Sequence, residues 1–224
     1  MVIFGSHDGY LRSLESENGK IVWKVNINGP LVASPLYKEH SSEVICATLK
    51  GQIFIFNKSD GIQIWSKNLD SPVFSKPILS KNSSNLILAT VKGILYELNL
   101  ETKTILWKYD TKNHIFAPIK FMNDFYFFGT QEGNVFTVKS EDETCKVMAN
   151  MENSVIAGIR PLRSDLVLIL DTKSNFKILK LSQEKIVYQG SLNIGETFST
   201  PKYVEGNLFV GSRDDFMYCF DMIF

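Results

Sequence analysis

The sequence predicts an all-β protein, a β-propeller built from about six copies of a four-stranded antiparallel unit. Trp23, Trp65 and Trp107 are spaced 42 residues apart, and a Pro follows each Trp about a dozen residues later. A repeat of this length, rich in β-branched and aromatic residues, is typical of a propeller blade. With 224 residues and 44% hydrophobic content, the chain can bury a sizeable core as one domain.

A second set of positions supports the repeat. A residue that ends an expected strand recurs at steps of 42, 42, 40, 41 and 41 residues, at Gly5, Ala47, Ala89, Gly129, Leu170 and Gly211. From the second copy onward, the strands expected before these positions cover residues 44–47, 86–89, 125–128, 166–169 and 208–210. We therefore interpret residues 1–224 as a single domain of six units, at residues 1–29, 30–71, 72–112, 113–153, 154–195 and 196–224.

A tight hairpin is expected after each of these strands. Four units carry a Gly four residues later, at Gly9, Gly51, Gly93 and Gly133, and Gly reaches positive φ without a Cβ clash. The following strand alternates with period two, as in 52–56, 94–98 and 216–220, and a bulky inner face at this period is what a strand sandwiched between neighbouring blades requires.

A second hairpin follows in each unit. It contains Asn18-Gly19 in the first unit and Asp60-Gly61 in the second, and both pairs favour a type I′ turn. The third copy, residues 101–104, lacks the Gly but keeps the length.

The outer strand is expected to end on the Trp, at residues 21–23, 63–65 and 105–107. A flat ring at this place can stack on the adjoining unit and fill the wedge between radially arranged sheets. A Pro then opens the innermost strand, where no ladder hydrogen bond is lost. The residues interpreted as structural, blade-docking positions are Trp23, Trp65, Trp107, Gly19, Gly61, Gly5, Gly9, Gly51, Gly93, Gly129, Gly133, Gly211, Pro35, Pro77, Pro118 and Pro201.

Two units depart from this pattern. The fourth has Val147 at the Trp position, preceded by the polar stretch 140–144. The fifth has Tyr188 at the Trp position and Ser174 in place of the turn Gly. We expect these two units to pack less regularly than the others, through drift or as a specialised face.

Charge and cysteine content limit the partners and the compartment. The 24 basic residues balance the 24 acidic ones, so neither nucleic acid nor an anionic membrane is an expected partner. No signal peptide precedes the first strand, and Cys46, Cys145 and Cys219 are odd in number without metal-like spacing. These features favour the cytoplasm.

The sequence shows no catalytic constellation. His7, His40 and His114 occupy different phases of the repeat, which argues against a shared metal site. Acidic residues are expected in turns, as at Asp8, Glu17, Asp60 and Glu132, and no phosphate-binding Gly-rich loop precedes a helix. We therefore expect no catalytic residue, no cofactor and no metal in this chain.

The stretch from Leu14 through Gly19-Lys20 and Trp23 to residues 29–35 resembles the quinoprotein-like (PQQ-type) propeller repeat. In that family, a turn ending in Gly-Lys and a docking Trp lock neighbouring blades together. Residues 2–8 and 208–221 are similar to the C-terminal propeller of the β-alanine-activating enzyme, an acyl-CoA-synthetase-like protein. The resemblance implies that an adenylation domain and a phosphopantetheine carrier domain precede the propeller, and that the chemistry of amino acid activation lies there.

The strand count predicts an incomplete or open propeller. The chain begins in the second strand of one unit and stops after the third strand of the last, which gives 22 strands where six complete units need 24. We therefore expect the N-terminal part to be missing. Unpaired edges of this kind invite association.

These observations favour a non-catalytic interaction or scaffold domain with a protein partner, either the carrier or adenylation domain of the same enzyme or the acceptor of the activated amino acid. Two alternatives remain. A PQQ-dependent dehydrogenase would need a calcium site and a catalytic Asp, and a membrane-assembly or luminal-sensor propeller would need an export signal. The repeat alone does not identify binding residues.

Overall fold

The computed structural model describes residues 1–38, 41–69, 71–139, 144–163 and 165–222. The described residues form 22 β-strands, one 3₁₀ turn, η1 (Leu181–Gln183), and no α-helix. Four sheets have four strands, and the first and last have three. The all-β prediction and the count of 22 strands are thus confirmed.

The six antiparallel sheets follow one another along the chain. Sheet 1 is β1 (Val2–Gly5), β2 (Tyr10–Leu14) and β3 (Ile21–Asn26); sheet 2 is β4 (Leu36–Tyr37), β5 (Glu43–Ala47), β6 (Gln52–Asn57) and β7 (Gln63–Asn68); sheet 3 is β8 (Ile78–Leu79), β9 (Asn85–Ala89), β10 (Ile94–Asn99) and β11 (Ile105–Asp110). Sheet 4 is β12 (Lys120–Met122), β13 (Phe125–Gly129), β14 (Asn134–Lys139) and β15 (Cys145–Asn150); sheet 5 is β16 (Gly158–Arg163), β17 (Leu166–Leu170), β18 (Asn175–Lys180) and β19 (Lys185–Ser191); sheet 6 is β20 (Lys202–Val204), β21 (Asn207–Gly211) and β22 (Met217–Asp221).

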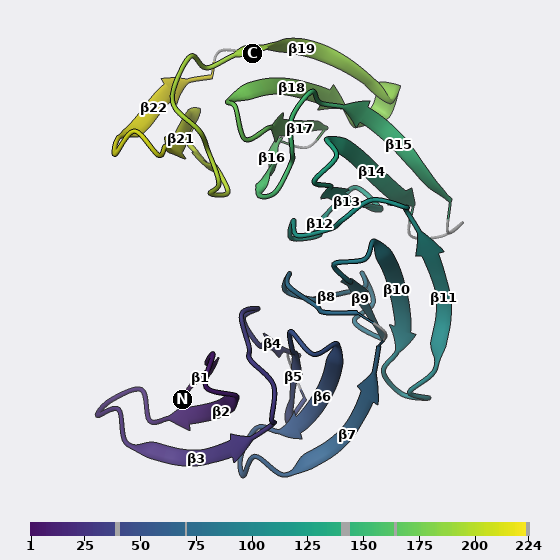
Figure 1. Ribbon diagram of the computed structural model, residues 1–224, viewed down its shortest axis with the longest axis vertical. Coiled ribbons are helices and arrows are strands. Elements are labelled where there is room, and N and C mark those ends of the chain that lie inside the picture. Colours follow the sequence, from purple (N-terminus) through teal and green to yellow (C-terminus); the bar gives the residue numbers. More distant parts are fainter. Residues whose placement is uncertain (39–40, 70, 140–143, 164, 223–224) are drawn as a thin grey trace. The chain divides into compact units, whose positions relative to one another are not determined.

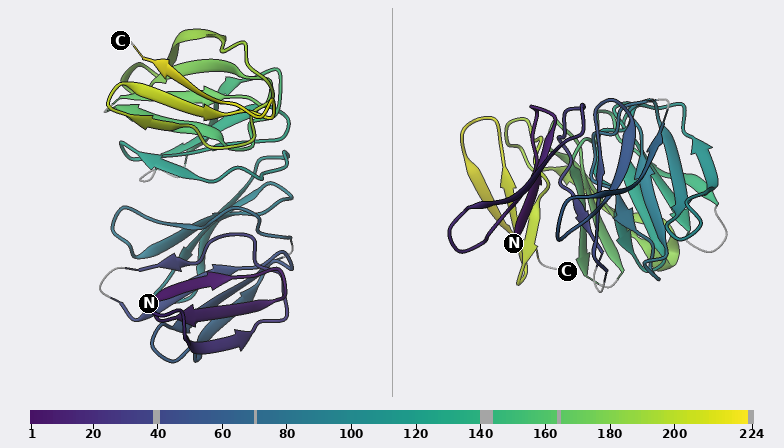
Figure 2. Two further views of the ribbon diagram at one scale, coloured as in Figure 1. Left: turned by 90° about the vertical axis from the view of Figure 1, so that its left-hand side faces the viewer. Right: turned by 90° about the horizontal axis from the view of Figure 1, so that it is seen from below.

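The sheets belong to two compact units, Met1–Lys112 with sheets 1 to 3 and Asn113–Phe224 with sheets 4 to 6. Within the first unit, the long last strands β3, β7 and β11 lie along one side, and the short β4 and β8 lie at the opposite edges of their sheets (Figure 1). Figure 2 shows the strands of neighbouring sheets stacked over one another within a unit. The interpretation of the whole chain as a single domain stays a prediction.

The segments that connect sheets hold neighbours together through the backbone. In the first unit, the Leu31 amide donates to Ser6 in the sheet before it at 3.2 Å, and the Leu49 amide of the next sheet donates to Pro30 at 2.9 Å. The same two bonds recur in the second unit, from Val155 to Thr130 and from Thr172 to Ser154, both at 2.9 Å. Leu31 and Val155 are buried, so their bonds satisfy amide donors that burial would otherwise leave unpaired.

Apolar cores fill the space between sheets. The core between sheets 2 and 3 contains buried residues from both, including Ile45, Ile55 and Leu88. In β6, the four residues from Ile53 to Phe56 are all buried, so this strand buries both faces. Burial of both faces agrees with the expectation that this strand is sandwiched between neighbouring sheets, because such a sheet has no solvent face.

The first hairpin of each sheet has the conformation that the Gly residues predict. Gly9, Gly51, Gly93 and Gly133 have φ between 76 and 89°. Ser174 and Asp215 take the same place in sheets 5 and 6, with φ of 63 and 70°. Each loop therefore ends on a left-handed residue, as in a three-residue hairpin loop.

The second hairpin differs from the prediction. Gly19 and Gly61 have positive φ, but Asn18 and Asp60 do not, which rules out a type I′ turn. Each loop has four residues, since the Glu15 amide bonds to Lys20 and the Gly19 amide bonds back to Glu15. The third copy keeps this geometry without Gly, with φ of 60° at the final loop residue Lys103.

The strand boundaries correct two further expectations. Trp23, Trp65 and Trp107 are the third residues of β3, β7 and β11, so the outer strands continue past the ring instead of ending on it. The prolines Pro35, Pro77, Pro118 and Pro201 lie just before β4, β8, β12 and β20 rather than inside them. Proline ends the connecting segment there, and the strand begins with the next residues able to donate to the ladder.

In sheets 4 and 5, the residues at the Trp positions are more exposed than Trp23. Val147 and Tyr188, at the Trp positions, are 50% and 55% exposed, whereas Trp23 is 7% exposed. A contiguous core including Phe127, Val135, Ile169 and Leu179 nevertheless joins the two sheets. The polar residues 140–143 and His40 lie outside the described residues. No helix in the described parts of the chain has the length and apolar character needed to cross a membrane.

Candidate functional site

Trp23 docks sheet 1 against sheet 2. Its indole N–H donates to the carbonyl of Lys58 at 2.9 Å, and its side chain is 7% exposed. A Cβ at position 61 would lie 2.8 Å from the indole ring, so only glycine leaves room for the ring at this position. Both partners belong to the second hairpin of sheet 2, which the ring therefore covers.

The other two tryptophans make different contacts. Trp65 is partly buried and packs against the core between sheets 2 and 3. The Trp107 indole donates to Glu97 Oε2 at 2.6 Å, and Asn85 Nδ2 donates to Glu97 Oε1, also at 2.6 Å. Glu97 is 8% exposed in β10, where the preceding sheet has Ile55. These bonds satisfy a buried carboxylate in an otherwise apolar strand.

A buried hydroxyl recurs at the start of the first hairpin. Thr48, Thr90 and Thr130 are fully buried, and each accepts a backbone N–H through Oγ1. Sheet 5 has Asp171 at this position. It keeps the role of the hydroxyl through Oδ1, which accepts the amides of Lys173 and Asn175 at 2.9 Å.

The second carboxylate oxygen of Asp171 has no counterpart in the threonine copies. Oδ2 accepts the side-chain amides of Asn153 and Asn175, both at 3.0 Å. Asp171 is 1% exposed, and four N–H donors compensate for its burial. Asp171 in place of Thr thus holds a set of hydrogen-bonded polar groups at one edge of sheet 5.

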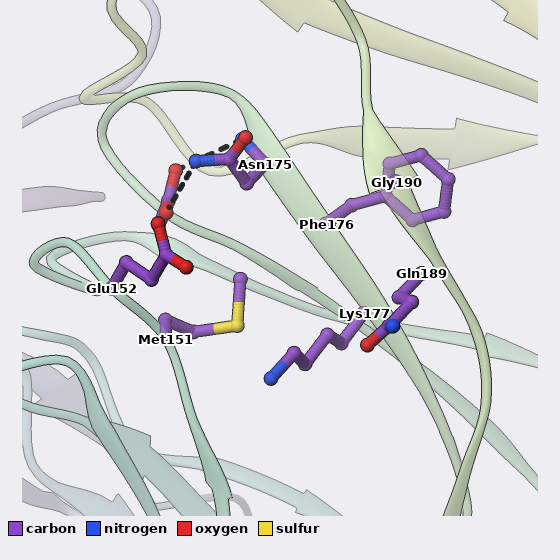
Figure 3. A pocket seen from close by; sticks show the side chains of 8 residues that line it. Met151, Glu152, Asn175, Phe176, Lys177, Gln189 and Gly190 are labelled. Carbon is purple, nitrogen blue, oxygen red and sulfur yellow. Dashed lines mark hydrogen bonds between the residues drawn. The ribbon is translucent and has the colours of Figure 1, made fainter.

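Asp171 and Asn175 border a pocket of about 370 Å³. The pocket is lined by Met151, Glu152, Asp171, Asn175, Phe176, Lys177, Gln189 and Gly190. Figure 3 shows Met151 and Glu152 on one side, Phe176 and Gly190 on the other, and Asn175 between them. The lining comes from the segment after β15, the hairpin between β17 and β18, the start of β18 and the end of β19.

Gly190 lines the pocket without a side chain. It takes the place that Val25, Lys67, Tyr109 and Ala149 occupy in the earlier outer strands. A Cβ there would lie 3.1 Å from the Phe176 ring, which leans over the glycine. The Trp position of β19 holds Tyr188, which is 55% exposed.

Charges of both signs line the pocket. Lys177 Nζ donates to the carbonyl of Asn150 at 2.7 Å, and the side chain of Glu152 is exposed. A row of side-chain amides leads toward this lysine, since Asn134 donates to Asn113 at 2.6 Å and Asn150 donates to Asn134 at 2.7 Å. The arrangement offers hydrogen-bond donors, acceptors and apolar contacts with Met151 and Phe176.

A separate polar pair joins the first hairpin of sheet 4 to the segment before β12. Glu132 accepts the backbone amide and Nδ1 of His114, the latter at 2.7 Å. Burial acts to raise the pKa of the Glu132 carboxyl, but the hydrogen bonds from His114 outweigh it and the pKa is lowered. Among the described residues, no group of three or more His, Cys, Asp or Glu side chains is placed to hold a metal ion.

The sequence reasoning missed the residues of this pocket. A signal for Asp171 was present, since the residues after the repeat's small position read Ser6, Thr48, Thr90, Thr130, Asp171 and Ser212. Glu97 was also visible as a charge inside an apolar strand. Lys177 and Gly190 carried no such signal, because their neighbours come from other segments of the chain.

Comparisons with solved structures show the fold. BamB from Moraxella catarrhalis has a TM-score of 0.81 at 17% identity, over 98% of this chain and 69% of that one. The computationally designed Ika8 protein has a TM-score of 0.84 at 12% identity, over 98% of this chain and 67% of that one. No curated protein matches.

A family model described as the β-propeller of the β-alanine-activating enzyme matches residues 1–222. The match covers all six sheets. The resemblance drawn from residues 2–8 and 208–221 is thereby confirmed, and the chain belongs to the β-propeller family of the β-alanine-activating enzyme.

Proposed function

We propose that this chain is a non-catalytic, cytoplasmic interaction domain of an amino-acid-activating enzyme, and that it docks the carrier or adenylation domain or the acceptor of the activated amino acid. The family match supports the link to such an enzyme. The observation that carries a docking role is the pocket beside Asp171, with its mixed charged, amide and apolar lining.

The lining fits a protein segment better than it fits a reaction. The groups that border the pocket include two carboxylates, one ammonium and two side-chain amides, but no His, Cys, Ser or Thr that could act as a nucleophile or as a base near neutral pH. Protein interfaces combine apolar anchors with a polar rim of this kind. Met151 and Phe176 would supply the apolar contact, and Glu152, Lys177 and Gln189 the rim.

The carrier domain is the first partner to test. The chain is titrated separately with the purified carrier domain and the purified adenylation domain of a β-alanine-activating enzyme, and affinity is measured by biolayer interferometry. Lys177→Glu is expected to weaken binding about tenfold, because it reverses a charge that lines the pocket. Lys185→Glu is the matched control, since Lys185 is exposed on β19 outside the pocket and carries the same charge change.

Circular dichroism melts of both variants check that the fold is intact. The proposal predicts binding by the unmodified chain and by Lys185→Glu, with a clear loss for Lys177→Glu. Equal affinities for the two variants would place docking elsewhere, and no binding of either domain would remove the carrier and adenylation domains as partners.

A further inference from the structure

One position in the first strand of each four-stranded repeat changes from apolar to basic between the two units. Its residue pairs with the residue two places before the end of the next strand of the same sheet. In the first unit this residue is apolar, at Leu36 in sheet 2 and Ile78 in sheet 3. In the second unit it is basic in all three sheets, at Lys120, Arg160 and Lys202.

The strands that carry these three residues are neighbours. β12, β16 and β20 form the sheet edges opposite β15, β19 and β22, and Figure 1 shows β12 and β16 on that side. Cα atoms of β12 come within 8 Å of β16, and the same holds for β16 and β20. We call this row of strands the inner edge of the second unit. Its three basic residues occupy the same ladder position on adjacent strands, so their charges form one row.

Arg160, in the middle of this row, has a donor without an acceptor. Its cross-strand neighbour Leu168 is 1% exposed and belongs to the core between sheets 5 and 6. The Nε of Arg160 is buried and, within the parts of the chain that the structure describes, has no hydrogen-bond partner. A buried donor without an acceptor destabilises a fold, whereas an apolar residue such as Leu36 of sheet 2 fills this position without that cost. A bound anion would supply the acceptor that Arg160 lacks.

We propose that the inner edge of the second unit binds a phosphate group, with Arg160 as the central ligand and Lys120 and Lys202 as flanking charges. The planar guanidinium matches the oxygens of a phosphate, and lysine adds a point charge. A phosphate monoester carries about two negative charges at pH 7, whereas a single carboxylate would compensate only one of the three cations. The site shares no residue with the pocket beside Asp171 and does not depend on the function proposed for that pocket.

The acidic residues nearest in sequence lie away from the ladder position. Asp124, Asp165 and Glu205 belong to the turns that follow β12, β16 and β20. The carboxylate of Asp165 accepts the backbone amide of Ser182 at 2.7 Å and its hydroxyl at 2.6 Å. The ladder position itself is therefore positively charged in all three sheets, which favours an anionic ligand.

The test is a calorimetric titration of the full chain with inorganic pyrophosphate at low ionic strength. Arg160→Leu places at this position the residue that sheet 2 carries there, so the variant is expected to fold. Its affinity for pyrophosphate should fall about tenfold or more, because it removes the central charged donor. Arg163→Leu is the matched control, since it removes the same charge from an exposed residue of the same strand. Its affinity should stay within about twofold of the unmodified chain.

Urea titrations give a second readout. Without pyrophosphate, Arg160→Leu should be at least as stable as the unmodified chain, because it removes a buried donor that lacks a partner. Pyrophosphate should raise the urea midpoint of the unmodified chain and of Arg163→Leu, but not that of Arg160→Leu. A less stable Arg160→Leu would give the guanidinium a structural role instead and would overturn the proposal. The absence of pyrophosphate binding, equal losses in both variants, or equally tight binding of citrate, which carries only carboxylates, would overturn it as well.

Discussion

Replacing Trp23 with Ala removes the contact that joins sheets 1 and 2. The side chain is 7% exposed, lies against Gly61 and donates to the Lys58 carbonyl. Truncation of a buried Trp to Ala costs about 3 to 5 kcal/mol. Trp23→Phe keeps most of the apolar contact but loses the N–H donor, so we expect a smaller cost of about 1 to 2 kcal/mol.

The first unit carries its own reporters for this measurement. Trp65 and Trp107 both lie within Met1–Lys112, so their fluorescence in a urea titration follows the unfolding of that unit after Trp23 is removed. Val22→Ala is the matched control, because Val22 precedes the Trp in β3 and is 43% exposed. Its effect should stay within about 0.5 kcal/mol.

The order of the three variants is the test. The structure requires Trp23→Ala to be the most destabilising, Trp23→Phe intermediate and Val22→Ala nearly neutral. If Trp23→Ala lowered the free energy of unfolding by no more than Val22→Ala does, the indole would not dock the two sheets, and the role given to Gly61 would also be wrong.

Three further outcomes follow from single residues. Gly51→Ala should destabilise the chain more than Gly19→Ala in urea titrations. Both glycines have positive φ, but a Cβ at Gly51 would lie 2.6 Å from a backbone oxygen, whereas a Cβ at Gly19 would have nothing within 4 Å. Equal losses of stability would show that the first hairpin of sheet 2 can shift. Burial raises the pKa of the Cys46 thiol to about 12. Iodoacetamide at pH 8 should therefore label the exposed thiol of Cys219 and leave Cys46 unmodified until urea unfolds the chain. Labelling of Cys46 before unfolding would contradict its burial. The hydrogen bond from Arg12 is the main cause that lowers the pKa of Asp8 from 3.8. The stabilisation from this pair is therefore fully present above pH 3.8 and is lost as the pH falls toward the lowered pKa. Asp8→Asn should flatten the fall in the urea midpoint between about pH 5 and 2, and an unchanged slope would show that the ion pair does not stabilise the fold.

The fold could be predicted because local chemistry repeats with the period of the sheets. Gly9, Gly51, Gly93 and Gly133 mark places where the backbone needs positive φ, a requirement that sequence displays directly. Ser174 adopts the same conformation, although its side chain does not signal it. The position in the repeat, and not the residue type alone, therefore determines the turn.

The details of the second hairpin could not be read in this way. Asn18-Gly19 suits a two-residue turn, but the neighbouring residues form a four-residue loop in which Gly alone is left-handed. The choice between the two loops depends on the register of β2 and β3, which shifts by one residue between Ser13 and Leu14. A dipeptide preference does not contain that information.

The pocket on sheet 5 depends on missing volume more than on any motif. Gly190 lacks a side chain and Asp171 replaces a hydroxyl, and both residues line the pocket. Their proximity is a property of packing between β18, β19 and the segment after β15. Sequence reasoning could have noticed the Asp, but not the space beside it.

The central claim is that the pocket beside Asp171 docks another domain of the enzyme, and a hydrogen-exchange footprint tests it most directly. The exchange of every backbone amide is compared with and without saturating carrier domain. The account predicts slower exchange in residues 151–153, 175–177 and 188–190, with residues 21–26 of β3 unchanged. Protection confined to other loops, or none at saturation, would contradict it.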